Sequence, residues 1–304
     1  MLDHYVGVDI GGTKTEVCLL ALSNPNEFAS AQLLTKKRMD TERTTSLSNF
    51  LDRLNSLTES ILSTHHLTMN EIRGMGVGVP GSIDPKWGVM RAGSIPFFLN
   101  TPLEGAFRDH FHFKGALAFD NDANCFALAE AYFGAGKSWA DRNQIKIKDL
   151  CMIGITLGTG VGGGIIVRGE LLRGRRGGAG EVGHTTLVES GRPCYCGKRG
   201  CVEQYLSGKG FASMPLEEYQ GHLISFLSNL SNCFDPHVIV LGGGVSHQAG
   251  IYDRILERLS HACFLTEDPP DVVPNERGDS SGVMGAGLLS FQAAIHEGVC
   301  NGVE

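Results

Sequence analysis

Strand-like and helix-like patterns of apolar positions alternate along the chain. Residues 5–22 comprise a β-branched run, a glycine turn and a second apolar run, which predicts a β-hairpin. Residues 151–167 repeat this plan, with Gly158–Gly160 where the first copy has Gly11–Thr13. Two copies of one strand–turn–strand pattern suggest an internally duplicated fold.

The segments between and after the hairpins predict an α/β protein. Residues 47–66 have helical periodicity, residues 72–81 predict a buried strand, and residues 115–134 predict a strand, a polar corner and an amphipathic helix. A further strand, at 237–241, ends in three glycines and precedes the helical pattern 252–260. We therefore expect helix N-terminal amides beside these glycines, where they could contact a ligand. Strands that alternate with helices indicate an α/β architecture.

Charge and composition exclude some partners. The 304 residues carry a formal net charge of −7 without a basic patch, so nucleic acid is not expected as a partner. We interpret the short basic stretches 36–38 and 173–176 as solvated loops. There is neither a membrane-length apolar run nor a signal-peptide pattern at the N-terminus, so we expect a cytoplasmic protein without a membrane partner. The 41 glycines are about twice the usual share and are clustered, which points to close-approach turns.

The nine cysteines divide into two groups. The cytoplasm, which is the expected location, is a reducing compartment, and this argues against disulfides. Six cysteines are scattered, mostly among apolar neighbours, and are predicted to fill the core as small apolar side chains: Cys18, Cys125, Cys151, Cys233, Cys263 and Cys300.

The other three cysteines, Cys194, Cys196 and Cys201, fall within one short loop, ten residues and more after His184. A disulfide between the first two would close a strained ring, and a redox pair normally has the spacing Cys-x-x-Cys. Three thiolates and one imidazole suit tetrahedral zinc, so the sequence predicts a structural Zn²⁺ in a zinc loop at 184–201.

Two acidic residues flank this loop. Glu181 precedes His184 by three residues, and Glu203 follows Cys201 by two. An ion that fixes His184 and Cys201 would also fix both carboxylates, which suits a site that needs rigid polar side chains. The alternative is that both are surface glutamates beside a structural metal loop.

The first glycine turn, "DIGGTK", could bind phosphate. Its backbone amides could approach phosphate oxygens, Thr13 could add a hydroxyl and Lys14 a charge, while Asp9 could orient Mg²⁺ through water. The spacing is neither that of a P-loop nor that of a dinucleotide fingerprint. A plain tight hairpin is the alternative.

The corner "FDNDAN" places acidic residues where a buried strand ends and a helix begins. An acid at this edge of a sheet is well placed to act as a general base. Alternatively, Asn121 or Asp122 could cap the helix.

Taken together, these motifs resemble the ROK sugar kinases (repressor, open reading frame, kinase) of the hexokinase/actin-like ATPase superfamily. The matching pieces lie between residues 9 and 287: "DIGGTK", "PGSID", "NDAN", "LGTGVGGG", "GEVGH", "CYCGKRGCVE", "DPHVIVLGGG" and "GDSSGVMGAG". The resemblance implies an α/β, two-domain actin-like ATPase (ribonuclease H-like) fold with an active-site cleft between the domains. The domains would be 1–119 and 120–290, with a C-terminal helix at about 291–304 packed back on the first.

The resemblance also implies ATP-dependent phosphorylation of the 6-hydroxyl of a hexose, with Mg²⁺ and a structural Zn²⁺. Asp122 would be the catalytic base, and His184 would bind zinc through one ring nitrogen and sugar through the other. The implied sugar-binding residues are Gly81, Ser94, Asn121, Asp122, Glu181, His184 and Glu203. The implied nucleotide-binding residues are Asp9, Gly11, Gly12, Thr13, Lys14, Gly158, Thr159, Gly160, Val161, Gly243 and Gly244.

Two departures from the family pattern matter. Ser94 stands where many relatives have a sugar-binding asparagine, and a serine cannot make both amide contacts. Around the segment 211–232, relatives typically have about 25 more residues, which form helices of the second domain; their absence here affects the cover of the nucleotide side and any homodimer contacts there.

The sugar is predicted to be fructose, mannose or glucose, with N-acetylglucosamine or N-acetylmannosamine as the alternative. The alternative from another class is a sugar-binding regulatory protein without catalysis. A DNA-binding repressor is disfavoured by the negative charge.

Overall fold

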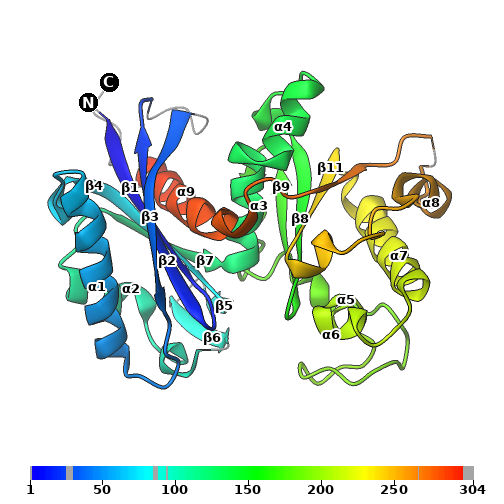
Figure 1. Cartoon of the computed structure of the whole chain (residues 1–304), viewed down its shortest axis with the longest axis horizontal. Helices are drawn as coiled ribbons and strands as arrows, with labels where there is room; N and C mark the ends of the chain where they lie inside the picture. Colours follow the sequence, from blue (N-terminus) through cyan, green and yellow to red (C-terminus); the bar gives the residue numbers. More distant parts are fainter. Residues whose placement is uncertain (1, 25–29, 85–87, 94, 266, 297–304) are drawn as a thin grey trace. The chain divides into compact units, whose positions relative to one another are not determined.

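The computed structural model describes residues 2–24, 30–84, 88–93, 95–265 and 267–296 (Figure 1). The described residues form two compact α/β units. The first unit comprises the described residues of Met1–Cys125, Gly174–Gly178 and Asp279–Glu304. The second comprises those of Phe126–Arg173 and Ala179–Gly278. None of the helices described is both long and apolar enough to cross a bilayer.

The sheet of the first unit confirms the first predicted hairpin. Strands β3, β2 and β1 are antiparallel neighbours, and β1, β4 and β7 run parallel. The strands in sheet order are β3 (Ala31–Asp40), β2 (Lys14–Leu22), β1 (Asp3–Ile10), β4 (Ile72–Val79) and β7 (Ala116–Asn121).

Side chains of β1 point alternately to the two faces of the sheet, and helices cover both faces. Val6, Val8 and Ile10 belong to a core shared with α1 (Leu47–Thr64) and α2 (Leu103–Phe111). On the other face, Tyr5 meets Phe291 of α9 (Ser281–His296) edge to face, with ring centroids 5.5 Å apart. Since successive strand residues point to opposite faces, one short run supplies both layers.

Helix α9 lies unusually close to this sheet because glycines face it. A Cβ added to Gly76 on β4 would come 1.8 Å from the Ala286 carbonyl oxygen, and one on Gly7 would come 2.2 Å from the Val283 oxygen. These glycines therefore serve helix–sheet packing, whereas the sequence analysis assigned the clusters to turns. The helix expected from about residue 291 begins at Ser281, and residues 297–304 lie outside the described part.

The sheet of the second unit repeats the first. Three antiparallel strands are followed by two parallel ones, which confirms the second hairpin and supports a duplicated fold. The strands in sheet order are β10 (Glu170–Leu171), β9 (Val161–Val167), β8 (Cys151–Leu157), β11 (Val238–Gly242) and β12 (Asp271–Pro274).

Helices also cover both faces of the second sheet. Helix α3 (Asp122–Phe133) packs Ala127 against Gly154 of β8, where an added Cβ would lie only 2.9 Å away. The opposite core includes α7 (Leu216–Phe234) and α8 (Ile255–Ala262). The remaining elements are the ribbon β5 (Gly81–Asp84) and β6 (Val89–Gly93), helices α4 (Ala135–Arg142), α5 (Glu203–Leu206) and α6 (Gly208–Phe211), and the 3₁₀ turns η2 (Met69–Glu71), η3 (Pro96–Phe98), η4 (Ile147–Asp149), η5 (Val182–His184), η6 (Gly244–His247) and η7 (Gly278–Ser280).

Three local predictions need correction. The glycines after β11 lead into the 3₁₀ turn η6, and α8 begins only at Ile255, so the nearby amides belong to the short turn. Residues 36–38 lie on the edge strand β3, not in a loop. Cys233 is exposed on the outer face of α7, and Cys151 is half-buried. Cys18, Cys125 and Cys263 are buried as predicted, and Cys300 lies outside the described residues.

Candidate functional site

The carboxyl ends of three parallel strands gather the candidate polar residues of the first unit. Asp9 on β1 pairs in register with Gly78 on β4, which pairs with Asp120 on β7. Gly81 follows β4, and Asp122 follows β7. This edge is where ligands bind in open α/β sheets.

Asn121 is the helix cap that the sequence left open as an alternative. Its Oδ1 accepts the Ala123 N–H at 2.8 Å, and its Nδ2 donates to the Gly81 carbonyl oxygen at 2.9 Å. The amide therefore begins α3 and fixes the turn after β4. Asp122, in the first turn of α3, keeps an exposed carboxylate, with Oδ1 2.8 Å from the Ala123 nitrogen.

Asp9 lies beneath the first turn of α9. A Cβ at Gly282 would come 2.2 Å from Asp9 Oδ2, so a larger residue there would displace the Asp9 carboxylate. Burial raises the pKa of Asp9 to about 7, and the Asp122 carboxylate and then Glu16 add to the rise, while Arg38 opposes it. Asp9 is thus a carboxylate for which a nearby cation would favour ionisation.

The turn of the first hairpin is fixed from outside. The Gly11 N–H donates to the Lys14 carbonyl oxygen at 2.9 Å. The buried Thr41 donates its hydroxyl to the Gly11 oxygen at 2.8 Å, and its N–H to the Thr13 oxygen at 2.9 Å. The sequence analysis missed Thr41, because its contact lies about 30 residues away and follows only from the pairing of β2 with β3.

A cavity of about 180 Å³ opens beside this turn, lined by Asp9, Lys14, Glu16 and Arg38. The buried Glu16 carboxylate lies 3.0 Å from Arg38 Nη2 and 3.2 Å from Lys36 Nζ. The cavity therefore offers two acidic and two basic side chains, a set that could hold an anion together with a cation. The sequence analysis missed Glu16 and Arg38. Basic residues at 36 and 38, two positions that lie on the same face of a strand, were the available signal.

The glycine turn of the second hairpin contacts Glu203. The Val161 N–H lies 3.4 Å from Glu203 Oε2, and a Cβ at Gly160 would come 2.7 Å from that oxygen. The Gly158 N–H bonds to the Gly160 oxygen at 3.0 Å, and the Gly158 oxygen accepts the Gly208 N–H at 2.7 Å. The candidate sugar residue Glu203 thus lies beside the candidate phosphate turn.

Gly243 lies at the same edge of the second sheet. Strands β8 and β11 are parallel, so their carboxyl ends meet. The φ of Gly243 is +84°, and an added Cβ would come 2.5 Å from the Leu157 carbonyl oxygen, which leaves glycine as the residue that fits. The structure therefore brings Gly158–Val161 and Gly243–Gly244 together within this unit.

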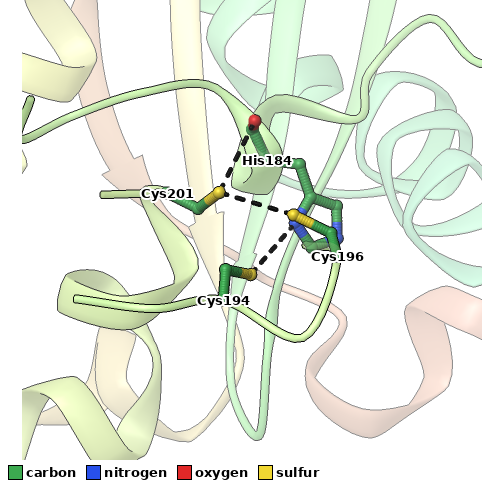
Figure 2. Close-up of side chains that lie close together, drawn as sticks. All are labelled: His184, Cys194, Cys196 and Cys201. Carbon is green, nitrogen blue, oxygen red and sulfur yellow. Dashed lines mark hydrogen bonds between the residues drawn. The ribbon is translucent and has the colours of Figure 1, made fainter. Parts of the chain in front are cut away.

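His184 and the three clustered cysteines converge on one point (Figure 2). Their ligand atoms all lie within 4.8 Å of one another, with Cys196 Sγ 3.6 Å from Cys201 Sγ and Cys194 Sγ 3.7 Å from His184 Nδ1. Metal–sulfur bonds of about 2.3 Å in a tetrahedron separate two sulfurs by about 3.8 Å. The geometry of these four residues therefore fits a zinc ion, and Nδ1 is the His184 nitrogen that faces Cys194.

The other nitrogen of His184 faces a residue that the sequence analysis did not consider. Tyr195 Oη lies 3.1 Å from His184 Nε2, and the two rings meet at 87° with centroids 5.2 Å apart. Partial desolvation, followed by the Glu203 carboxylate, raises the pKa of Tyr195 to about 12. Its position between two predicted ligands, Cys194 and Cys196, was the only signal in the sequence.

The candidate residues thus fall into two sets, each described within its own unit. The first unit holds Asp9, Gly11–Lys14, Gly81, Asn121 and Asp122. The second holds Gly158–Val161, Glu181, the His184, Cys194, Cys196 and Cys201 cluster, Glu203 and Gly243–Gly244. Ser94 lies outside the described residues.

The fold and these motifs match known proteins. The ROK family model matches residues 5–221 and 212–293. An N-acetyl-D-glucosamine kinase from Aliivibrio salmonicida is 30% identical, over 95% of this chain and 100% of the relative. Two solved structures are similar along their whole chains: a ROK hexokinase from Thermus thermophilus (TM-score 0.78, 26% identical, 97% of this chain and 100% of that chain) and a ROK family glucokinase from Streptomyces griseus in complex with glucose and AMPPNP (TM-score 0.70, 25% identical, 96% and 100%).

The chain belongs to the ROK family. The alignment with the Aliivibrio salmonicida kinase extends over 330 positions, more than the 304 residues here, so the relative has residues without a counterpart. The family model matches in two pieces that meet at 212–221, which agrees with the shortened segment inferred from the sequence. In the structure, the continuous helix α7 occupies this region.

Proposed function

We propose that the protein is an ATP-dependent N-acetylglucosamine kinase that phosphorylates the sugar 6-hydroxyl. Its enzyme class follows from the family: it is a ROK sugar kinase. The sequence analysis placed fructose, mannose or glucose first and N-acetylglucosamine second. Several relatives at 30–32% identity over at least 94% of the chain are N-acetylglucosamine kinases. This observation supports the proposal and puts N-acetylglucosamine first.

Asp122 is the proposed base, which takes the proton of the attacking hydroxyl. Its carboxylate is exposed at the start of α3, while the neighbouring Asn121 is occupied in fixing this corner. The hydrogen bonds of the Asn121 side-chain amide thus hold Asp122 and Gly81 in place. General-base catalysis requires such a fixed position of the base. Glu181, His184 and Glu203 are the proposed sugar ligands from the second unit.

The glycine turns and the charged cavity are the proposed ATP-binding elements. Lys14 and Arg38 supply positive charge beside the Gly11–Lys14 turn, and Asp9 and Glu16 supply oxygens that suit Mg²⁺. In phosphoryl transfer, the bound Mg²⁺ neutralises charge on the phosphates. Gly158 and Gly244 leave room for phosphate and adenosine, because nothing lies within 4 Å of a Cβ added to either residue.

We propose that His184, Cys194, Cys196 and Cys201 hold a structural Zn²⁺. Four ligands from the protein fill a tetrahedral site and leave no position for catalysis at the metal. The ion would fix the His184 ring through Nδ1 and hold α5, which begins with Glu203, two residues after Cys201.

Phosphorylation of glucose or a related hexose is the second candidate, favoured by the similarity to the Thermus thermophilus hexokinase and the Streptomyces griseus glucokinase. The two candidates differ in the substituent at carbon 2 of the sugar. Substrate profiling separates them directly.

The test is ADP release with ATP and Mg²⁺ against N-acetylglucosamine, N-acetylmannosamine, glucose, mannose and fructose. We expect the highest kcat/KM with N-acetylglucosamine, and Asp122→Asn should lower kcat by about 10²–10⁴-fold while the sugar Kd stays within a few-fold. Asp149→Asn, at an exposed carboxylate on η4, is the matched control and should retain full activity. A near-wild-type kcat for Asp122→Asn would refute the base assignment.

A further inference from the structure

The His184 ring presents one nitrogen to the cysteines and the other to Tyr195. Nδ1 lies 3.7 Å from Cys194 Sγ, whereas Nε2 lies 3.1 Å from Tyr195 Oη. A neutral imidazole that gives its Nδ1 lone pair to a cation keeps its proton on Nε2. Nε2–H is then the donor, and the Tyr195 hydroxyl oxygen accepts.

A sugar oxygen bound to His184 needs the same proton. A single N–H makes one well-aligned hydrogen bond, since the bond weakens steeply with angle. The Tyr195 hydroxyl and a sugar hydroxyl are therefore mutually exclusive partners of Nε2.

The Tyr195 side chain is free to move away while its backbone is held. The residue is 79% exposed, so little packing opposes rotation of the ring. Its neighbours Cys194 and Cys196 are both in the metal cluster, and the loop is closed by the Cys194 N–H to Lys198 oxygen bond at 2.8 Å.

We infer that Tyr195 is an affinity-setting residue, whose hydroxyl competes with the sugar for His184 Nε2–H and must leave before the sugar binds. The inference deepens the proposed function and rests on it, because it takes His184 as a sugar ligand. The competition weakens sugar binding and so raises KM without a part in phosphoryl transfer.

The test compares Tyr195→Phe with wild type in zinc-loaded protein. Calorimetric titration gives the Kd of N-acetylglucosamine, and ADP release gives KM and kcat. Tyr132→Phe is the matched control, because it removes a hydroxyl that donates to the Gly169 oxygen on the same unit. Metal analysis of each variant verifies that the zinc content is equal.

Loss of one competing neutral hydrogen bond should lower the sugar Kd of Tyr195→Phe by about two- to tenfold, with KM falling in parallel and the change confined to binding. An unchanged or weaker affinity would overturn the inference, and so would an equal gain in Tyr132→Phe. Wild-type turnover decides the kinase assignment separately. If wild type neither binds nor phosphorylates any of the five sugars, the inference and the proposed function both fail.

Discussion

Asp9 places a carboxylate on a strand whose neighbouring positions are apolar, under the first turn of α9. Its pKa is raised from 3.8 to about 7, by burial first and by the Asp122 carboxylate second. A raised pKa means that ionisation costs the folded protein more than the unfolded chain. The contribution of protonated Asp9 to the free energy of unfolding is therefore fully present below about pH 4 and is lost as the pH rises through 7.

Asp9→Asn should therefore stabilise the metal-free protein at alkaline pH. In EDTA at pH 8, we expect the free energy of unfolding to rise by about 1–3 kcal/mol over wild type, and the difference should shrink towards pH 5. Urea unfolding at both values, with Asp149→Asn as the control, measures it. A difference that does not depend on pH would show that Asp9 is not the titrating group. The same variant should lose kinase activity, since Asp9 is a proposed Mg²⁺ partner.

The place of a residue in the fold could be predicted where the local sequence pattern determines it. Asn121 and Asp122 could be placed at a strand–helix corner because the period of the apolar pattern changes there. His184 and the cysteines could be grouped because short spacing limits how far apart they can lie. Tyr195 could not be assigned a contact, because the direction of an exposed side chain depends on the fold of the zinc loop.

At the scale of elements, both hairpins and α1 follow from their patterns, and Ser46, which accepts the Asn49 N–H, marks the start of α1. Edge strand β3 was missed, since its outward positions carry lysine and arginine, which typically protect an exposed sheet edge. The start of helix α9 was expected at about residue 291, ten residues after its actual start at Ser281. Its first turns consist largely of glycine, alanine and serine, which lack an amphipathic pattern because they pack closely on glycines of the sheet.

Gly76→Ala tests this close packing. The added Cβ would come 1.8 Å from the Ala286 carbonyl oxygen, so α9 must move, and we expect a loss of about 2–4 kcal/mol in the free energy of unfolding. Gly105→Ala is the matched control: Gly105 is exposed on α2 with nothing within 4 Å of the added Cβ, and the change should stabilise by about 0.5–1 kcal/mol. Urea unfolding of the two variants should give opposite signs. Two equal losses would show that the effect is not specific to the α9 contact.

The whole molecule consists of two units with the same sheet plan and separate hydrophobic cores. The sequence predicted this duplication from the two hairpins, because each unit needs a glycine turn at the corresponding place. The resemblance also implied a C-terminal helix at about 291–304 packed back on the first domain. Residues 279–296 return to the first unit with α9 after β12 has completed the second sheet, but the start of this helix at Ser281 was not predicted. That return depends on packing between distant segments.

Separate cores predict that zinc stabilises one unit alone. Purified protein should contain about one zinc per chain, and its removal by a chelator, or Cys201→Ser, should cost the second unit several kcal/mol and lower its unfolding temperature by roughly 10 °C. The first unit should keep its transition, so calorimetry should resolve two peaks where the units unfold independently. Gly76→Ala should shift the other peak, because Gly76 packs under α9 in the first unit. A single peak that moves as a whole in both experiments would show that the two units unfold as one cooperative body, and a folded, active protein without metal would refute the zinc assignment.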